Sequence, residues 1–477
     1  MKINQHKILI SIVGISLCTL TACKIPLISE KTATNTLPVN YGINQDSTNA
    51  ELPNWKTYFS DPILIALIDT ALSNNQEISI INQELAISKN EIRAKKGEYL
   101  PFLNLKAGIG YEKTAKYTRN GAVEEALPIK EGKAFPTILG DYFVGGLASW
   151  ELDVWNKLHN ATKAASIRYL STQEGKHFAI TTIVSEIASS YFELVILDNQ
   201  LEIIEQSASI QADALRIIKQ QKEAAKVTQL AVNRFEAQLL NTQNRQFEVK
   251  QHILELENKI RFLTGSYLPT VKRNSSALQQ LLDQNMPAGI PVQVLERRPD
   301  IRAAILDMQA AKLDVQAAKA NFYPSFRIQA GLGFQSFNPV YLVNPASILY
   351  NMAGDMVAPL INKNAITATY LNTNAKQIQT VFIFQQKLLQ AYTEVLNQLG
   401  KNSNYEKSYA MKLKEVELLL QSTTISSNLF NAARADYVEV LLTQREALES
   451  KIQLTEILMN RISAKVKLYQ SLGGGWN

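Results

Sequence analysis

The sequence predicts an α+β membrane protein, an internally duplicated chain with four transmembrane β-strands and long antiparallel coiled-coil helices. Two runs, opened by Pro101 and Pro324, alternate apolar side chains with polar residues or glycine. This period of two is typical of a strand with one apolar and one polar face. The runs lie more than two hundred residues apart in a chain whose pattern is otherwise helical. They therefore indicate a repeated unit.

The N-terminus has the pattern of a signal peptide over residues 1–22. Lys2 and Lys7 precede a largely apolar stretch that is too short to span a membrane as a stable anchor. Its last residues, Leu20, Thr21 and Ala22, stand before Cys23 and resemble the bacterial lipobox. In a lipobox the cysteine becomes the first residue of the mature chain and carries the lipid, with palmitate as the expected acyl group.

We therefore expect Cys23 to be lipidated and the mature chain to have no other cofactor. The alternative is an ordinary cleaved signal followed by a chance cysteine. Lys24 resembles the corresponding residue of lipoproteins released to the outer membrane, which predicts a lipid-anchored outer-membrane location. Cys18, the only other cysteine, is discarded with the signal, so no internal disulfide can form.

Composition excludes two classes of protein. Apolar residues make up 46% and charged residues 19% of the chain, which is typical of a folded protein. Removing residues 1–22 removes two lysines and no acid, which lowers the formal net charge from +6 to +4. Without a basic tract this mild charge argues against nucleic-acid binding. No uninterrupted apolar run of transmembrane-helix length follows the signal, which argues against a polytopic inner-membrane transporter.

The first half of the mature chain predicts a tether and one repeat. Residues 23–60 are rich in Thr, Asn, Ser and Pro and predict an extended tether carrying the lipid. The first repeat, 61–268, begins with a helix from Asp61 and Pro62 to about Gly97. It continues with strands near 99–118 and 138–154, separated by a long exposed loop, and with a helical hairpin whose tip lies near Glu223.

The second half repeats this order. A linker at 269–298 precedes the second repeat, 299–477, which opens with a helix and has strands near 324–337 and 347–360. A long helical hairpin follows, with its tip near Arg434. Short matches align the halves, such as Asn156-Lys157 with Asn362-Lys363.

The predicted dimensions restrict the architecture. A helix of roughly 65 residues is about 100 Å long, so it needs partners of the same total length. Four amphipathic strands of roughly ten residues suit a bilayer, but an open sheet would leave unpaired edges in lipid. Copies must therefore share a barrel: two copies would close eight strands and three would close twelve. The alternative is an ordinary sheet over a soluble core.

The polar face of the strands predicts what such a barrel would enclose. Four side chains on this face are expected to point into the lumen: Asn104, Lys106, Arg327 and Gln329. Glycines stand between them, so the predicted interior is hydrophilic and uncrowded. Such an interior suits a conduit.

Over nearly the whole mature chain the sequence resembles the TolC-like outer-membrane efflux family, and more closely its OprM-type (NodT-like) lipoprotein branch. The most specific segments are Trp150–Trp155, Arg297–Ala304, Gln444-Arg445 and Leu472–Trp476. The resemblance implies a homotrimer whose twelve-stranded barrel continues into a twelve-helix periplasmic α-barrel. It also implies docking to a periplasmic adaptor (membrane fusion) protein and to an inner-membrane efflux pump of the RND type.

The resemblance implies a passive exit duct of a tripartite efflux system for small molecules such as drugs or metal ions. The pump would supply the energy and most substrate selection, and the chain would not be an enzyme. Two alternatives remain: a lipid-anchored coiled-coil structural or adhesion protein without a pore, and a protein-secretion duct. The sequence has no nucleophile elbow, phosphate-binding loop or dinucleotide motif. His159, His177 and His252 have no partners at metal-ligand spacing.

Two departures from the family concern the helical tips. Relatives usually have glycine where this chain has Ala225 and Ala433, and an aspartate that narrows the closed periplasmic end where this chain has Leu442. The candidate gate comprises Arg434, Asp436, Glu439 and Leu442 at the second tip, and Lys222, Glu223 and Lys226 at the first. We hypothesise that tip charges contribute to closure and to adaptor docking; the alternative is that they are solvated helix ends. Arg297 and Arg298, before Pro299, are expected to be structural.

Overall fold

The computed structural model describes residues 25–29, 31–32, 37–38, 41, 52–267, 270–275, 277–283, 291–292 and 296–476. The chain forms two compact units. One is built chiefly from Ile87–Tyr169 and Leu306–Val381, and the other from Ala33–Ala86, Leu170–Ile305 and Phe382–Asn477. Each unit thus takes segments from both halves of the sequence. The spatial units therefore do not coincide with the predicted repeats 61–268 and 299–477.

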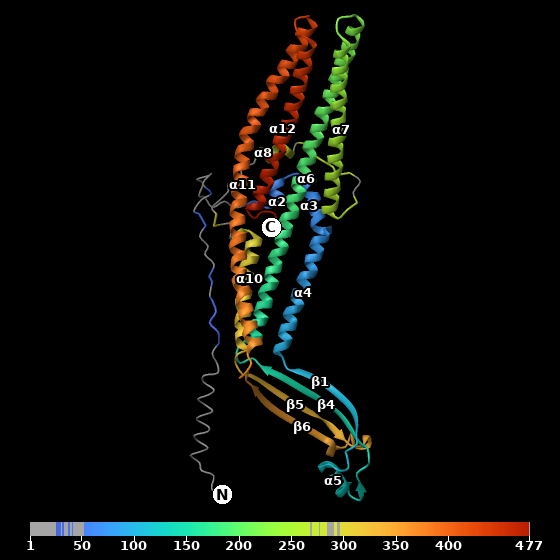
Figure 1. Cartoon of the computed structure of the whole chain (residues 1–477), viewed down its shortest axis with the longest axis vertical. Helices are drawn as coiled ribbons and strands as arrows, with labels where there is room; N and C mark the ends of the chain where they lie inside the picture. The colour runs from blue at the N-terminus through green and yellow to red at the C-terminus, as the bar shows by residue number, and fades with distance from the viewer. Residues whose placement is uncertain are drawn as a thin grey trace. The chain divides into compact units, whose positions relative to one another are not determined.

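The first unit contains a four-stranded antiparallel sheet in the order β1-β4-β5-β6 (Figure 1). Its strands are β1 (Phe102–Glu112), β4 (Leu139–Leu152), β5 (Ser325–Ser336) and β6 (Ile348–Val357). Each strand lies inside one of the four segments expected from the alternating pattern. The central pair joins the two halves of the chain, because β4 pairs with β5 from Tyr142–Ser336 to Leu152–Phe326.

The connections between these strands have structure of their own. The segment after β1, expected as a long exposed loop, contains α5 (Arg119–Ala126) and a small hairpin of β2 (Pro128–Lys130) and β3 (Lys133–Ala134). Thr118 caps α5 by accepting a hydrogen bond from the Gly121 amide. The second connection forms two 3₁₀ turns, η1 (Pro339–Tyr341) and η2 (Pro345–Ser347). Lys130 reaches across to Tyr341, with its ammonium 4.8 Å from the ring centroid.

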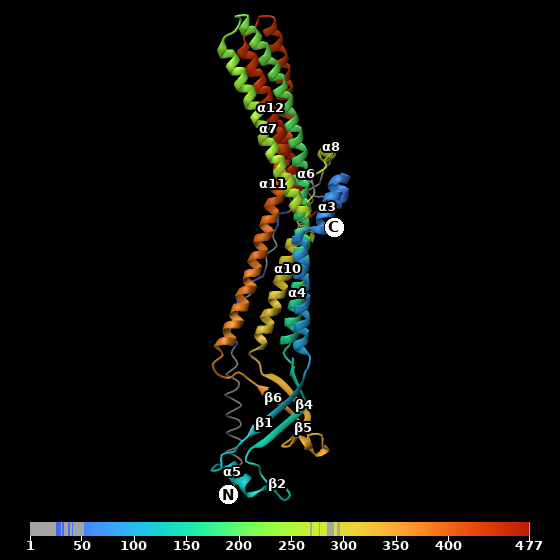
Figure 2. The same cartoon turned by 90° about the vertical axis from the view of Figure 1, so that its right-hand side faces the viewer.

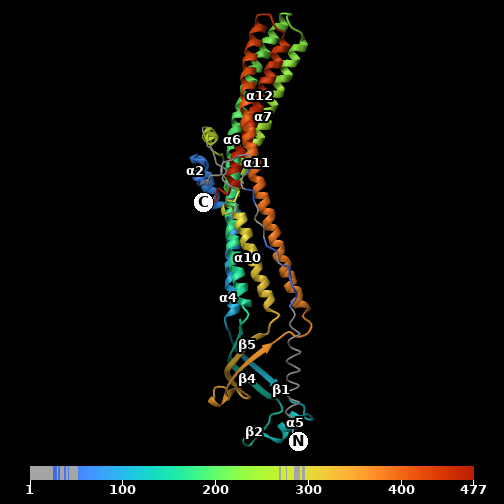
Figure 3. The same ribbon diagram turned by 90° about the vertical axis from the view of Figure 1, so that its left-hand side faces the viewer.

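Four long helices form two helical hairpins (Figure 2). α6 (Lys157–Glu223) has 67 residues and turns into α7 (Gln229–Thr264), while α11 (Asn364–Asn431) has 68 and turns into α12 (Tyr437–Ser471). Near their tips the hairpins share an apolar cluster, in which Leu215, Ile218 and Phe235 pack with Phe430 and Tyr437. α12 lies beside α7 in Figure 3 and contacts it.

The predicted apolar stripe of α6 is the core of the second unit. Ile187, Tyr191 and Leu194 on this stripe are buried. By length and composition alone, α6 could cross a membrane, since it contains an 18-residue window of mean hydropathy 1.5. Within the chain, however, 72% of that window is buried. The window therefore packs as a core helix.

The N-terminal segment contributes more to the core than the sequence pattern indicates. Trp55, Tyr58 and Phe59, in the predicted tether 23–60, are buried in α2 (Trp55–Phe59). The ring of Tyr58 stacks on that of Tyr469, with 4.3 Å between centroids. Burial of three large aromatic side chains outweighs the polar composition around them. These three residues of the predicted tether are therefore part of the core.

The helix expected from Asp61 to about Gly97 is two helices. α3 (Pro62–Asn74) begins as predicted, with Asp61 accepting from the Ile63 amide. Asn75 then adopts an extended conformation and accepts hydrogen bonds from the amides of Glu77 and Ile78, which starts α4 (Gln76–Tyr99). A side-chain cap thus divides a continuous apolar pattern.

The predicted linker 269–298 also contributes to the fold. It contains α8 (Ala277–Asp283), and Val271, Leu281 and Arg298 are buried. The buried Lys465 of α12 donates hydrogen bonds to the carbonyl oxygens of Leu281 and Leu282, at 3.0 and 2.6 Å. The second repeat begins as α10 (Pro299–Ala320).

Three matched pairs of left-handed residues mark the duplication in the backbone. Asn156 and Asn362 precede the long helices with φ of 57° and 55°, and Ala225 and Ala433 stand at the tips with φ of 56° and 57°. Gly265 and Gly473 follow the returning helices with φ of 60° and 92°. The chain therefore turns in the left-handed region, with the same residue types, at matching places in both halves.

Each helical tip closes with a Schellman motif that has alanine where glycine is usual. At the first tip the amide of Ala225 donates to the Lys222 carbonyl and that of Lys226 to the Gln221 carbonyl, at 3.0 and 2.9 Å. At the second tip Ala433 and Arg434 make the equivalent bonds to Phe430 and Leu429. The motif places its central residue in the left-handed region, where a Cβ atom is unfavourable.

Replacing both alanines with glycine should stabilise the tips. We expect Ala225→Gly and Ala433→Gly each to stabilise the local structure by about 0.5–1 kcal/mol, because the steric penalty outweighs the added freedom of glycine in the unfolded chain. Hydrogen exchange of peptides that cover the tips should slow. Ala224→Gly and Ala432→Gly are matched controls, since neither residue has positive φ. Faster exchange in Ala225→Gly than in wild type would contradict the assignment.

Candidate functional site

The sheet has one apolar and one polar face. Residues that face each other across antiparallel strands share a face, so the register assigns every side chain. Leu103, Leu105 and Ile109 of β1 share a face with Tyr350 and Met352 of β6. All five are exposed, including Leu105 at 83% and Tyr350 at 83%. Large apolar side chains on an exposed sheet face suit contact with lipid.

The four residues predicted to point into a lumen all lie on the opposite face. Lys106 pairs with Gly145, which pairs with Gly333, and Asn104 lies two residues from Lys106 on the same face. Arg327 and Gln329 of β5 share this face through the same register. The structure thus brings residues from both halves of the chain onto one polar surface.

The polar face also carries acidic residues that the sequence analysis did not identify. Arg327 stands between Glu151 of β4 and Asp355 of β6 in one cross-strand row. Asp141 lies near the other end of the strands, where its Oδ1 accepts a hydrogen bond from Gln335 at 2.8 Å. The alternation used for β1 and β5, extended to β4 and β6, would have found Asp141, Glu151 and Asp355, and Glu112 of β1 lies on the same face. The polar face therefore carries both signs of charge.

Glycine keeps the middle of the polar face low. A methyl group on Gly145 would lie 2.8 Å from the Gly333 Cα, and one on Gly333 would lie 2.7 Å from the Gly145 Cα. Both distances are too short for a Cβ atom, so the two glycines permit the close pairing of β4 and β5 here. Around Gly108 a Cβ atom would meet nothing within 4 Å. The Phe143 ring lies against Gly145, 2.9 Å from the methyl position on that glycine, so Lys106 stands among glycines and one aromatic side chain.

The Trp150–Trp155 segment joins β4 to α6 through side-chain bonds. Trp150 donates its indole N–H to the Tyr99 carbonyl at 2.9 Å, and Trp155 donates to the Pro324 carbonyl at 2.7 Å. Asp153 accepts from the backbone amides of Leu158 and His159 at 3.0 and 2.8 Å, which caps α6. The segment thus connects the end of β4, the end of α4 and the start of α6.

The carboxylate of Asp153 is held in its charged form. Its side chain is only 2% exposed, and it contacts Nδ1 of His159 at 2.7 Å. Burial opposes the charge, but the hydrogen bonds from the His159 and Leu158 amides and the contact with the His159 ring outweigh it and lower the pKa of Asp153. The charged form is therefore the one that supports the helix start.

Replacing Asp153 with asparagine should destabilise the junction by about 1–2 kcal/mol at neutral pH, because the cap loses its charge. Since the folded-state pKa is lowered, the stabilisation is present above the ordinary aspartate pKa and is lost as pH falls through the folded-state value. Thermal unfolding of wild type and Asp153→Asn in detergent should therefore differ at pH 7 and converge under strongly acidic conditions. An equal difference at both pH values would contradict the charged cap. Asp69→Asn is a suitable control, since its partner Lys56 is a surface side chain.

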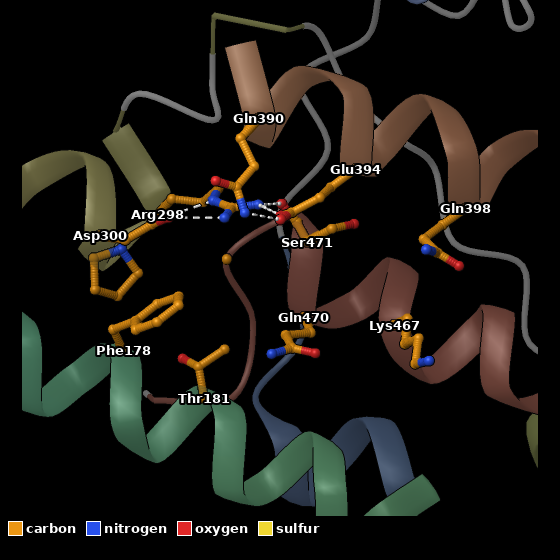
Figure 4. A pocket seen from close by; sticks show the side chains of 12 residues that line it. Phe178, Thr181, Arg298, Asp300, Gln390, Glu394, Gln398, Lys467, Gln470 and Ser471 are labelled. Atoms are coloured by element: carbon orange, nitrogen blue, oxygen red, sulfur yellow. Dashed lines mark hydrogen bonds and ion pairs between the residues drawn. The ribbon is translucent and has the colours of Figure 1, made fainter. Parts of the chain in front are cut away.

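Arg298 binds three elements of the second unit together (Figure 4). Its guanidinium donates to both carboxylate oxygens of Asp300 at 3.0 and 2.8 Å, to Glu394 of α11 at 2.7 Å and to the carbonyl of Ser471 in α12 at 3.2 Å. Burial disfavours its charge, but Asp300 and Glu394 outweigh this and raise the pKa of Arg298. These contacts occupy the guanidinium internally, as expected for a structural residue. A polar pocket lined by Thr181, Gln390 and Lys467 opens beside it.

The C-terminal Leu472–Trp476 segment packs onto this arginine motif. A methyl group on Gly473 would lie 2.9 Å from the carbonyl carbon and oxygen of Arg297, so only glycine fits there. Trp476 stacks on His177, with 4.6 Å between ring centroids, and the guanidinium of Arg302 lies 5.5 Å from the indole centroid. Two of the segments that carry the family resemblance, Arg297–Ala304 and Leu472–Trp476, therefore pack against each other.

The charged residues of the candidate gate are all exposed at the two tips. Lys222, Glu223 and Lys226 surround the turn at Ala225, and Arg434, Asp436 and Glu439 surround the turn at Ala433. Among the described residues none of these six charges makes an ion pair. Leu442 lies on α12 and is 40% exposed, so it points away from the core of its own chain.

Two further predictions concern the lipobox and the histidines. Leu20, Thr21, Ala22 and Cys23 lie outside the described residues. His159 and His177 each contact one acidic side chain, Asp153 and Glu174 respectively. Across the described part of the chain, no three His, Cys, Asp or Glu side chains gather where they could hold a metal ion.

Comparison with known proteins agrees with this architecture. The sequence model of the outer membrane efflux protein family matches residues 67–266 and 290–474. The solvent efflux pump outer membrane protein SrpC of Pseudomonas putida is 25% identical over 434 residues, which cover 91% of this chain and 90% of SrpC. The probable outer membrane lipoprotein SilC of Salmonella typhimurium is 22% identical over 422 residues, or 88% of each chain.

Among solved structures, the open state of the MtrE outer membrane channel of Neisseria gonorrhoeae superimposes with a TM-score of 0.82 at 19% identity. The superposition covers 95% of this chain and 98% of MtrE. Together with the two-faced sheet and the paired hairpins, the family match identifies the class of protein. The chain belongs to the outer membrane efflux protein family.

Proposed function

We propose that three copies of this chain close a twelve-stranded barrel in the outer membrane, continuous with a twelve-helix α-barrel in the periplasm. The assembly is a passive exit duct for small molecules. One observation carries this proposal: each chain supplies four two-faced strands in a sheet whose two outer edges are unpaired in the described structure. Three such sheets give twelve strands, enough to enclose a water-filled lumen.

The unpaired edges require further strands. In the described structure β1 pairs only with β4, and β6 pairs only with β5. The outer edges at Phe102–Glu112 and Ile348–Val357 therefore lack partners for half of their backbone N–H and C=O groups. In lipid each unpaired group costs several kcal/mol. Pairing of β1 with β6 of a second copy removes this penalty on every chain when the ring closes.

The helical hairpins carry apolar stripes that also need partners. On α7 the residues Leu240, Phe247 and Leu254 recur every seven positions and are exposed, with Phe247 at 70%. On α11 the residues Met411, Leu418 and Ile425 have the same spacing and are exposed, with Met411 at 76%. A seven-residue spacing is that of a coiled-coil seam. A neighbouring copy is the partner that satisfies both stripes and the strand edges together.

The membrane location follows from the family, and the lipid anchor is part of the proposal. Cys23 after Leu20, Thr21 and Ala22 supplies the acylation site, and the apolar face of the sheet supplies the transmembrane surface. We place the helical tips in the periplasm, where an adaptor protein and an inner-membrane pump, of the RND type by resemblance, would deliver cargo. The duct itself needs no cofactor beyond the lipid and performs no catalysis.

Purified protein should be trimeric and should form pores in planar bilayers. Phe247→Glu, which places a charge on the α7 stripe, should shift the detergent-solubilised protein from trimer toward monomer, as measured by light scattering of the protein component. Asn241→Glu is the matched control: it lies on the same helix, is exposed, and is about 120° away around the helix axis. A monomeric wild type without pores would refute the duct and leave the coiled-coil scaffold as the explanation.

The tip charges give a separate prediction about closure. Asp436 and Glu439 lie at the start of α12, and we propose that they take part in closing the periplasmic end. Asp436→Ala combined with Glu439→Ala should increase single-channel conductance severalfold, because it removes two acids per chain from the tips. Glu446→Ala combined with Glu456→Ala, farther along α12 from the tip, is the control. Conductance equal to that of wild type would show that these charges are only solvated helix ends.

A further inference from the structure

We propose that Lys106 sets the ion preference of the duct by placing a positive charge at mid-height of the barrel, which disfavours cations and favours neutral or anionic cargo. This inference rests on the proposed trimeric duct. Lys106 is exposed on the polar face of the sheet, and in the described part of the chain no hydrogen bond or ion pair engages its ammonium.

The row that contains Lys106 holds no other charge. Across the sheet this row continues as Gly145, Gly333 and Leu349. The next row on one side contains Asn104, Leu147, Gly331 and Asn351, and the next on the other contains Gly108, Phe143 and Gln335. The three central rows therefore carry one ionisable side chain per protomer, among four glycines and six uncharged side chains.

The acids of the polar face lie too far along the strands to neutralise Lys106. Asp141 pairs with Gly110, four residues from Lys106 along β1 and thus about 13 Å away, and Glu112 lies six residues from Lys106, about 20 Å away. Arg327, Glu151 and Asp355 form a row six residues from Gly333 along β5, about 20 Å away. All of these separations exceed the Debye length of about 8 Å at physiological salt. Lys106 therefore determines the electrostatic potential in the part of the lumen that surrounds it.

Closure of the barrel multiplies this charge. Three copies place three Lys106 ammonium groups at one level of a shared lumen, where glycine leaves room for an ion to pass between them. Rings of basic side chains select against cations in other pores. The acids at both ends would attract cations to the mouths, so the central ring would be the barrier that decides which ions cross.

The test measures ion selectivity in planar bilayers under a KCl gradient. Wild type should favour chloride over potassium relative to Lys106→Gln, and Lys106→Glu should raise the potassium-to-chloride permeability ratio by about threefold or more over wild type at low salt. The effect should weaken at high salt. Lys272→Glu, an exposed position outside the sheet and the helical hairpins, is the matched control.

Thiol labelling separates charge from folding. Apart from Cys23, which the lipid is expected to occupy, the mature chain has no cysteine, so Lys106→Cys can be labelled selectively. A positively charged thiol reagent should restore the wild-type permeability ratio, and a negatively charged one should move it further toward potassium. If neither the substitution nor the label changes the potassium-to-chloride permeability ratio, the role of Lys106 is wrong, but the proposed duct still stands. Absence of pores in wild type would remove the duct and this inference together.

Discussion

The unpaired backbone at the two edges of the sheet is the constraint on which the rest of the structure depends. A soluble protein can expose a strand edge to water, but a strand in lipid cannot leave its amides without partners. β1 and β6 are the edges of the described sheet, and in the proposed trimer the opposite edge of another copy supplies partners of matching length. In that proposal the symmetry, the lumen and the pairing of the helical stripes all follow from closing the ring, because the same neighbour meets each requirement.

Most of the fold could be predicted from local pattern. Strand positions came from strict alternation after Pro101 and Pro324, and the hairpins came from apolar spacing and from the position of the turn residues. Prediction from the sequence pattern failed where a few long-range or capping contacts outweigh the local amino-acid composition. The tether prediction missed Trp55, Tyr58 and Phe59. The rings of Tyr58 and Phe59 pack against Tyr469, more than four hundred residues away. The break at Asn75 was hidden because a single capping amide interrupts an otherwise continuous helical pattern.

The polar face was predicted only in part, for a physical reason. Asn104, Lys106, Arg327 and Gln329 were identified because β1 and β5 alternate regularly. On β4 the polar face also carries Leu147 and Phe143, which makes its polar character less distinct in the sequence. Register removes this ambiguity, because each row of partners fixes the face of every member. The distinctive segments Trp150–Trp155 and Leu472–Trp476 were recognisable in the sequence, but their purpose, a helix cap and a packing joint, became clear only from their partners.

The tips show a consequence of duplication that goes beyond stability. Their backbones are nearly the same, with alanine in the same left-handed turn, yet Lys222, Glu223 and Lys226 sum to one positive charge while Arg434, Asp436 and Glu439 sum to one negative charge. In the proposed trimer the six tips would be equivalent in shape but would alternate in sign. A partner that recognises only the shape of a tip would have six equivalent binding positions. A partner that recognises charge would have three positive and three negative ones. Shape and charge would thus give the same rim two different symmetries.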